Sequence, residues 1–385
     1  MKTTQRLHLH LALGASALTS LQAGATEADT IAGESLREAA GDSVLIGAAA
    51  SADDLRDPKF VALYLRHFNA ITAHADMMPA RLVDDNRHYN FERADAVARF
   101  AQEHDLRFYG HMLLWQHLSR DWLFQDHEGR PLSRAQALDN LKGYIDTVVG
   151  RYRGKVKSWD VVNEAISDDD GEYLRDVPAR RAIGDDFVVK AFELAHKADP
   201  EAELYYNDYN IELPDKRAKT LRLLHEIRAA GGRIDAVGIQ GHWMLDENSP
   251  APSVISEAIR EFHAAGFKVM ITELDVDVLP RTTSGANLQS VEEGPNPYPH
   301  GLPDEVQRQL ARRYGEIFDA ILEPGVVTMI TFWGTHDGHS WLNDFPVKRR
   351  TNYPLLFDRA FNPKPAFQAV VESLERSKER PAAKK

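Results

Sequence analysis

Short apolar runs alternate with longer amphipathic stretches along most of the chain. The short runs are rich in Val, Ile and aromatic residues and are bounded by polar ones, which predicts buried strands. We expect eight strands, at Val44–Ala49, Asn69–Ala73, Arg107–Leu114, Val156–Glu164, Glu203–Tyr209, Ala236–Trp243, Val269–Leu274 and Val327–Trp333. Between them the amphipathic pattern predicts helices at Glu92–His104, Ser133–Arg151, Asp186–Ala198, Pro214–Ala230, Ser253–Ala265 and Pro303–Leu322.

This alternation predicts the fold class. Eight strands separated by helices favour an α/β protein with a closed parallel (β/α)8 TIM barrel and right-handed crossovers. A doubly wound open sheet is the alternative. No G-x-G-x-x-G follows the first strand, which weakens the dinucleotide-binding version of that alternative.

Two of the expected strands end on an acid. Trp159-Asp160-Val161-Val162-Asn163-Glu164 closes on Glu164, and Val269-Met270-Ile271-Thr272-Glu273 closes on Glu273. A strand that ends on a buried acid needs compensation, since burying a charge costs several kcal/mol. In a parallel barrel the carboxyl ends of all strands meet at one mouth, where active sites lie. Two carboxyl groups facing each other there suit glycoside hydrolysis, which needs one protonated and one ionised acid.

The other strand ends carry side chains that suit a sugar. Aromatic faces pack against the C–H faces of sugar rings, while amides and imidazoles bond hydroxyl groups. The candidates are His111 and Trp115, the run Asn207-Asp208-Tyr209-Asn210, Gln240 and His242, and Trp333 and Trp341. His242 is also suited to bonding Glu273 and keeping it ionised.

Composition and charge narrow the class of protein. A chain of 385 residues suits one α/β barrel with a leader and extensions. The net charge of −12 argues against binding nucleic acid, whose phosphates attract Lys and Arg. The chain has no Cys, so it has no disulfide and no cysteine-built metal site. We expect no cofactor and no metal; the histidines of His336-Asp337-Gly338-His339 lack a partner cluster at ligand spacing.

Residues 1–25 are expected to be a secretory signal peptide. Lys2 and Arg6 form a positive start, an apolar stretch follows, and Ala23-Gly24-Ala25 fits an A-x-A cleavage site. The alternative is an ordinary N-terminal helix. We expect residues 26–376 to form the catalytic barrel of an exported monomer, in the periplasm or outside the cell. The charged tail 377–385 should be frayed, and no apolar run is long enough to span a membrane.

At this point the motifs resemble glycoside hydrolase family 10, whose typical members are endo-1,4-β-xylanases. The likeness runs from about Val44 to Val371. It is carried by Trp159-Asp160-Val161-Val162-Asn163-Glu164, Ile271-Thr272-Glu273-Leu274-Asp275, Gly110-His111, Tyr205-Tyr206-Asn207-Asp208-Tyr209-Asn210, Trp333-Gly334-Thr335-His336-Asp337, Pro354-Leu355-Leu356-Phe357-Asp358 and Pro363-Lys364-Pro365-Ala366.

The resemblance implies hydrolysis of internal β-1,4-xylosidic bonds of xylan with retention of configuration. Glu164 would be the acid/base and Glu273 the nucleophile, with carboxyl groups roughly 5–5.5 Å apart. Asn163 and His111 would contact the sugar at the cleavage site, while Gln240 and His242 would support the nucleophile. The cleft would be walled by Trp115, Trp333 and Trp341.

The sequence also departs from the family pattern. Where the family usually has Thr-x-Glu-Asn-x-Met-Lys-Trp, this chain has Thr72-Ala73-His74-Ala75-Asp76-Met77-Met78-Pro79. Where it usually has Trp-His-x-Gln, this chain has Trp115-Gln116-His117-Leu118. The usual residues hold sugars on the non-reducing side of the cut. His74, Ala75, Met78 and Leu118 therefore either make room for a decorated or different glycan, or are compensated by neighbours such as Gln116.

Two other classes of protein also use barrel scaffolds. A non-catalytic carbohydrate-binding barrel is possible, since a fold does not fix a function, but it predicts a decayed acid pair and both acids are present. A barrel aldolase or phosphate enzyme needs a strand-end Lys or a Gly-rich phosphate loop after the last strands. Neither Glu273-Leu274-Asp275 nor Trp333-Gly334-Thr335 supplies one.

Overall fold

The computed structural model describes residues 35–246, 249–280 and 290–379. The expected signal peptide lies outside the described residues and stays a prediction, as do cleavage after Ala25 and the monomeric state. Part of the expected long loop, residues 281–289, also lies outside them, as does the end of the tail, residues 380–385. Within the described residues, no helix has both the length and the apolar character that a membrane crossing requires.

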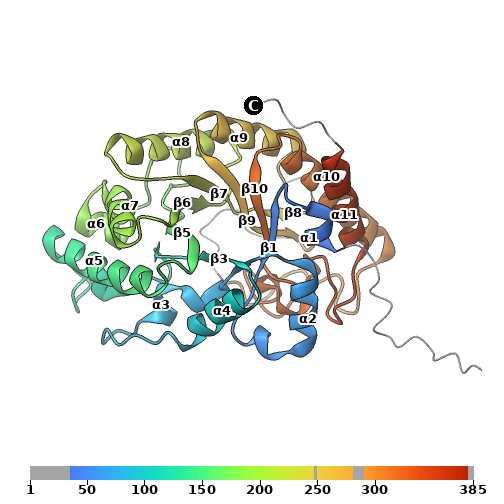
Figure 1. The fold of residues 1–385 in the computed structure, drawn as a ribbon, viewed down its shortest axis with the longest axis horizontal. Helices are drawn as coiled ribbons and strands as arrows, with labels where there is room; N and C mark the ends of the chain where they lie inside the picture. Colours follow the sequence, from blue (N-terminus) through green and yellow to red (C-terminus); the bar gives the residue numbers. More distant parts are fainter. Residues whose placement is uncertain (1–34, 247–248, 281–289, 380–385) are drawn as a thin grey trace, which may run out of the picture. The chain divides into compact units, whose positions relative to one another are not determined.

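Eight parallel strands form a closed barrel, which confirms the predicted fold class (Figure 1). Each strand pairs with the next, and β10 pairs with both β9 and β1, so the ring has no free edge. Its strands are β1 (Leu45–Ala49), β2 (Ala70–Thr72), β3 (Arg107–Gly110), β5 (Val156–Asn163), β6 (Glu203–Asp208), β7 (Ala236–Ile239), β9 (Lys268–Asp277) and β10 (Val327–Phe332).

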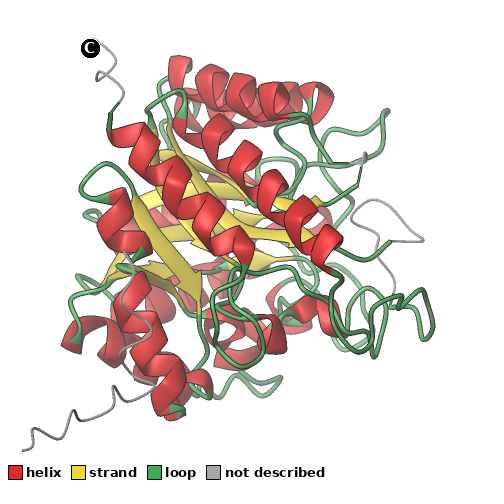
Figure 2. Cartoon of the chain, turned by 90° about the vertical axis from the view of Figure 1, so that its right-hand side faces the viewer, coloured by secondary structure: helices red, strands yellow, loops and turns green. Residues whose placement is uncertain are grey.

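Helices surround the barrel on the outside, as Figure 2 shows from the side. They are α1 (Leu36–Ala40), α2 (Pro58–His67), α3 (Pro79–Leu82), α4 (Glu92–Glu103), α5 (Arg134–Arg151), α6 (Pro178–Ile183), α7 (Phe187–Ala198), α8 (Pro214–Ala229), α9 (Pro252–Ala264), α10 (Asp304–Leu322) and α11 (Pro365–Lys378). Short 3-10 turns lie in the loops: η2 (Asp54–Arg56), η3 (His74–Met77), η4 (Asp121–Leu123), η5 (Asp337–His339) and η6 (Trp341–Asn343).

Local sequence sets the helix starts. Ser133 and Gln136 form a capping box at α5, in which each side chain bonds the other's backbone N–H. Proline occupies the first turn of α2, α6, α8, α9 and α11, where its missing N–H costs nothing. α11 runs to Lys378, two residues past the expected end of the barrel domain.

Two strands that we expected to be continuous are interrupted. The stretch 107–114 ends its first ladder at Gly110 and resumes as β4 (Leu114–Trp115), paired with β5. The stretch 236–243 ends at Ile239 and resumes as β8 (His242–Met244), paired with β9. In the second of these stretches, Gly241 turns the backbone out of the ladder. Its φ is +82°, a conformation that glycine adopts without steric cost.

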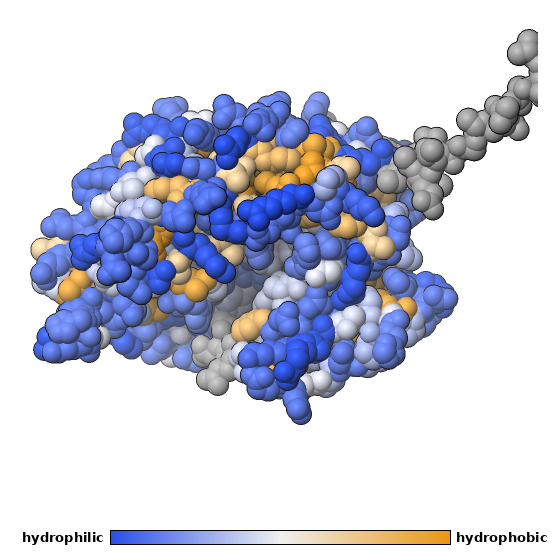
Figure 3. Space-filling model, turned by 90° about the horizontal axis from the view of Figure 1, so that it is seen from below, coloured by the Kyte–Doolittle hydropathy of each residue, from blue (hydrophilic) through white to orange (hydrophobic). Residues whose placement is uncertain are grey.

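The apolar side chains form two sets, because strand residues alternate between the barrel interior and the helices. A large cluster fills the space between strands and helices. A separate, smaller set comprises Ala70, Tyr109, Tyr205, Ala236, Met270 and Met329, with Leu45 packed against it. This second set alternates with helix-facing neighbours along each strand, so it forms the filled barrel interior. Hydrophilic side chains cover most of the face shown in Figure 3, where a hollow runs between two parts of the surface.

A buried lysine fixes the segment that follows β10. The Lys364 ammonium donates to both oxygens of the buried Asp337, at 2.9 and 3.2 Å. It also donates to the backbone carbonyls of Tyr353 and Leu355, at 2.8 and 2.6 Å. Asp337 in turn accepts from the Leu355 N–H at 2.9 Å. These bonds connect the loop after β10 to the segment 353–364, which leads into α11.

We predict that Lys364→Met lowers the free energy of unfolding by about 3–5 kcal/mol, because it leaves the Asp337 carboxylate buried and uncompensated. Urea unfolding followed by tryptophan fluorescence measures this. Lys197→Met, on the exposed side of α7, is the matched control and should change stability by less than about 0.5 kcal/mol. Equal stability of the two variants would contradict the prediction.

Candidate active site

Glu164 lies where β5 ends, and its side chain is only 8% exposed. One carboxyl oxygen, Oε1, accepts from Gln240 Nε2 at 2.9 Å, and from Asn163 Nδ2 at 3.3 Å. The other, Oε2, accepts from the indole N–H of Trp115 at 2.9 Å. The carboxyl group is therefore buried and held by three donors. Two of them, Gln240 and Trp115, come from other parts of the barrel.

Glu273 lies on β9 and is 4% exposed. Its Oε1 accepts from Asn207 Nδ2 at 2.7 Å, and the ring of His111 lies with Nδ1 4.0 Å from the same oxygen. Its Oε2 lies 3.2 Å from His242 Nε2, as the sequence predicted for this pair. Glu273 thus has donors or cations on both carboxyl oxygens.

A chain of amides connects the two carboxyl groups. Asn163 Oδ1 accepts one hydrogen bond from Gln240 Nε2 and another from Asn207 Nδ2, each 3.1 Å long. Gln240 uses its second amide hydrogen on Glu164, and Asn207 uses its second on Glu273. The resemblance implied that Gln240 would support Glu273, but its side chain bonds Glu164 and Asn163 instead. The two acids therefore belong to one hydrogen-bond network at the carboxyl ends of β5, β6, β7 and β9, the mouth at which barrel active sites lie.

The environment pushes the pKa values of the two acids in opposite directions. Burial, together with the charge of nearby Asp208, raises the pKa of Glu164 despite the bonds from Gln240 and Trp115. Burial would also raise the pKa of Glu273. The charge of His111 and the hydrogen bonds from His242 and Asn207 outweigh burial and lower the pKa of Glu273. These opposed shifts favour the protonated form of Glu164 and the ionised form of Glu273, which is the division that general acid catalysis beside a nucleophile requires.

Each imidazole beside Glu273 has a buried acid behind it. His111 Nδ1 lies 3.0 Å from Asp160 Oδ2, and His242 Nδ1 lies 3.0 Å from Asp275 Oδ1. Burial opposes protonation of His242, but Asp275 and Glu273 raise its pKa to about 10. Burial also opposes protonation of His111, and its bond with Asp160 raises its pKa. Both rings can therefore carry the positive charge that keeps Glu273 ionised.

Aromatic rings close the site on the side of β10. The Trp333 ring centroid lies 5.0 Å from that of His111 and 6.3 Å from that of His242. The Trp341 indole N–H donates to Asp275 Oδ2 at 2.7 Å, and its ring lies 5.0 Å from His242. Trp333 and Trp341 therefore face the imidazoles that support Glu273.

Comparison with known proteins agrees with this geometry. Residues 35–373 match the family model described as Glycosyl hydrolase family 10. The chain belongs to glycosyl hydrolase family 10. It is 38% identical over 348 residues to endo-1,4-beta-xylanase A of Xylanibacter ruminicola, covering 88% of this chain and 93% of the relative. It is 40% identical over 340 residues to an endo-1,4-beta-xylanase of Geobacillus stearothermophilus, covering 88% and 98%. A solved GH10 endoxylanase retrieved from sugarcane soil metagenome superposes with a TM-score of 0.82 at 36% identity, covering 89% and 99%.

The chain is thus a glycoside hydrolase, and its family 10 barrel brings together all the predicted site residues except Tyr209. Tyr209 does not contact the two acids directly but lies in a cluster of charged side chains beside the loop that follows Glu164. Its hydroxyl group hydrogen-bonds with Asp168 and Arg175, and the Lys216 ammonium lies 3.5 Å from its ring centroid. Whether Tyr209 also contacts a sugar stays a prediction.

Three supporting contacts in this family 10 site were not predicted, although Asn207 was expected at a strand end that suits a sugar. Asn207 bridges Asn163 and Glu273, while Asp160 and Asp275 orient the two imidazoles. Each lies in a motif that had already been recognised, next to or near a predicted residue. A second acid on the strand that leads to Glu164, and another on the strand of Glu273, was the available signal. The pairing of these acids with His111 and His242 across strands is not visible in one sequence.

The residues that depart from the family pattern lie in different environments. The His74 ring lies 5.2 Å from the Trp333 ring, so this substitution is part of the site wall. Burial lowers the pKa of His74, which favours a neutral ring. Ala75 and Leu118 are partly exposed, whereas Met78 is buried. His74 therefore brings one of these departures into contact with a predicted site residue, Trp333.

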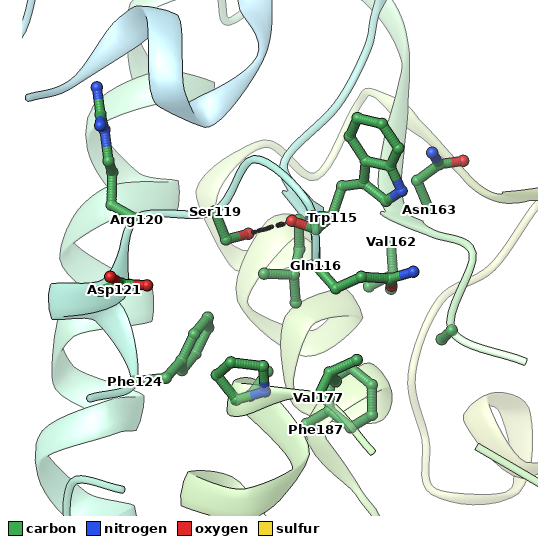
Figure 4. Close-up of a pocket in the computed structure, with 14 residues that line it drawn as sticks. Trp115, Gln116, Ser119, Arg120, Asp121, Phe124, Val162, Asn163, Val177 and Phe187 are labelled. Atoms are coloured by element: carbon green, nitrogen blue, oxygen red, sulfur yellow. Dashed lines mark hydrogen bonds between the residues drawn. The ribbon is translucent and has the colours of Figure 1, made fainter. Parts of the chain in front are cut away.

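A cavity lies next to Trp115 and Asn163 (Figure 4). Trp115 and Asn163 lie at one end of it, Gln116 reaches across it, and Phe124, Val177 and Phe187 close the other end. Its lining includes neither Glu164 nor Glu273. The cavity therefore lies beside Trp115 and Asn163, and Gln116 is part of its lining.

We predict that Gly238→Ala damages activity more than stability. A Cβ at Gly238 would lie 2.4 Å from Asn207 Oδ1 and 2.7 Å from the Thr272 side chain, so Asn207 must move away from Glu273. Displacing a group that orients the reacting carboxylate should lower kcat about ten- to a hundredfold.

Steady-state kinetics with urea unfolding measures the two effects. Gly150→Ala is the control, since nothing lies within 4 Å of its added Cβ in α5, and it should stabilise by up to about 1 kcal/mol. Full activity of Gly238→Ala would show that Asn207 need not occupy its observed position.

Proposed function

We propose that this chain is an endo-1,4-β-xylanase that hydrolyses internal β-1,4-xylosidic bonds with retention of configuration. The observation that carries the proposal is the carboxyl pair with opposed pKa shifts, joined by amides at the barrel mouth. Family 10 membership and full-length xylanase relatives support the choice of xylan as substrate.

In the first step, the ionised Glu273 attacks the anomeric carbon while Glu164 gives its proton to the glycosidic oxygen. The bond to the leaving sugar breaks and a covalent glycosyl ester forms on Glu273. In the second step, Glu164, now ionised, takes a proton from water as the water oxygen attacks the same carbon and frees Glu273. The carboxyl separation of roughly 5–5.5 Å that this mechanism requires stays a prediction.

The neighbours of the pair supply binding and orientation. We assign to Asn163 and His111 contacts with the hydroxyl groups of the sugar at the cleavage site, and to His242 and Gln240 the orientation of the acids. Trp115, Trp333 and Trp341 offer flat faces for sugar rings. A neutral, hydroxyl-rich polymer suits a chain with a net charge of −12.

The pKa shifts predict a bell-shaped dependence of kcat/KM on pH. Activity rises with pH as Glu273, whose pKa is lowered, becomes ionised. It falls at higher pH as Glu164, whose pKa is raised, loses its proton. His242, with a pKa of about 10, stays protonated throughout this window.

Glu164→Gln tests the assignment of the alkaline limb. With an aryl xyloside whose leaving group needs no protonation, this variant should retain the acid limb and lose the alkaline one. The parent enzyme on an aryl xyloside with a poor leaving group, which does need protonation, is the control that shows the alkaline limb. An alkaline limb that survives in Glu164→Gln would assign it to another group.

A second candidate is a family 10 enzyme for decorated or non-xylan β-1,4-glycans. The observation that favours it is His74, whose ring packs against Trp333 where the family usually has a glutamate. Such a ring changes the shape and hydrogen bonding of the site wall. A purely carbohydrate-binding role is disfavoured, because both acids are present and each is held by donors.

We predict that linear xylan yields short xylo-oligosaccharides, and this product profile tests the choice of substrate. Linear xylan, arabinoxylan and mixed-linkage glucan are digested in parallel, with Glu273→Ala as the inactive blank. Products confined to arabinoxylan or glucan would favour the second candidate. No products from any of the three would contradict the proposed activity on polymers.

A further inference from the structure

The backbone of Glu164 has an unusual conformation. Its φ is +59°, in the left-handed region that residues with a Cβ rarely adopt. Two hydrogen bonds hold it: the Glu164 N–H donates to the Asn207 carbonyl at 2.9 Å, and the Glu164 carbonyl accepts from Arg175 Nε at 3.0 Å. The first bond comes from the neighbouring strand, while the second depends on one side chain.

Arg175 reaches Glu164 because the chain folds back after β5. Ile166 and Leu174 form an antiparallel bridge, and the Arg175 N–H donates to the Ala165 carbonyl at 2.9 Å. This return places the guanidinium beneath the strand end, where it is 11% exposed. Its terminal nitrogen donates to Asp168 Oδ2 at 2.8 Å and to the Tyr209 hydroxyl group. The planar group is thereby oriented by partners other than Glu164.

The partners of Arg175 are themselves fixed from α8 and β6. The Lys216 ammonium, 8% exposed, lies 2.9 Å from Asp168 Oδ1 and 2.9 Å from Asp208 Oδ1. Tyr209 donates to Asp168, completing a closed cluster of two cations, two acids and a phenol. Arg175 is thus the member of this cluster that bonds the main chain of Glu164.

We propose that Arg175 is a positioning residue for the carboxyl group of Glu164, acting through the Glu164 main chain. The inference rests on the proposed role of Glu164 as general acid. Gln240 and Trp115 bond the carboxyl group only when the backbone holds it between them. If Arg175 is lost, the backbone can relax toward an ordinary conformation and carry the carboxyl group away from the glycosidic oxygen.

The test separates positioning from folding and from sugar binding. A series of aryl β-xylobiosides with dinitrophenyl, nitrophenyl and phenyl leaving groups demands progressively more protonation in the first step, which kcat/KM reports. Arg175→Met should lower kcat/KM about ten- to a hundredfold on the phenyl substrate and less than about threefold on the dinitrophenyl one. The dependence of rate on leaving group should steepen accordingly.

Three further variants make the result specific. Arg181→Met removes an exposed arginine that pairs with Asp176 and should leave the whole series unchanged. Asp168→Asn, which removes a partner of Arg175, should steepen the series to a smaller extent. It also tests the inference if Arg175→Met does not fold. Arg175→Lys keeps a cation but not the planar fork, so it should restore only part of the phenyl activity.

A uniform loss on all three substrates would overturn the inference, because it would indicate damage to folding or binding alone. Unchanged kinetics in both Arg175→Met and Asp168→Asn would overturn it as well. The parent enzyme reports separately on the proposed function. If the parent cleaves aryl cellobiosides but not xylobiosides, the choice of xylan fails, and the same leaving-group series on cellobiosides still decides the role of Arg175.

Discussion

The structure depends on keeping two buried carboxyl groups close together in different protonation states. A buried carboxylate costs several kcal/mol unless cations or hydrogen-bond donors compensate it, and a second one nearby adds repulsion. For Glu164 the raised pKa favours the neutral acid, while for Glu273 the neighbours His111, His242 and Asn207 favour the ionised form. Asn163 accepts from both bridging amides, so neither acid can be repositioned without disturbing the other.

The barrel satisfies this constraint by stacking a polar layer on an apolar one. Tyr205 and Met270 fill the interior, and two residues further along the same strands Asn207 and Thr272 form the support of Glu273. Gly238 lies between those two side chains, with no room for a Cβ. A small residue at that position lets the amide of Asn207 approach Glu273 closely, so β7 shapes the site at Gly238 as well as through Gln240 just beyond its end.

Much of this arrangement could be predicted from the sequence, because strand ends carry a recognisable pattern. A buried core strand is not expected to end on an uncompensated acid. An apolar run that ends in Asn163-Glu164 or Thr272-Glu273 departs from this expectation, and such a departure indicates a site. Pairs across strands could not be predicted, since Asp160 behind His111 and Asn207 beside Glu273 depend on register. α2 and α11 were missed although Asp57-Pro58 is an ordinary helix start, and the breaks at 110–114 and 239–242 depend on contacts that one sequence does not reveal.

Asp208 links the electrostatics of Glu164 to its position. This acid is fully buried, and its charge is the second cause, after burial itself, that raises the pKa of Glu164. It also accepts from Lys216, which bonds the Asp168 that orients Arg175. Burial raises the pKa of Asp208, but Lys216 and Tyr206 oppose that shift and favour the charged form that repels a second charge on Glu164. Lys216 thus affects both the position and the pKa of Glu164. A cation that bonded Asp208 more strongly would also screen the charge of Asp208 from Glu164, and the pKa of Glu164 would then be lower. Arg175 bonds the main chain of Glu164 rather than its carboxyl group. The guanidinium can therefore orient the acid without donating a hydrogen bond to the carboxyl oxygens, which would favour loss of the proton.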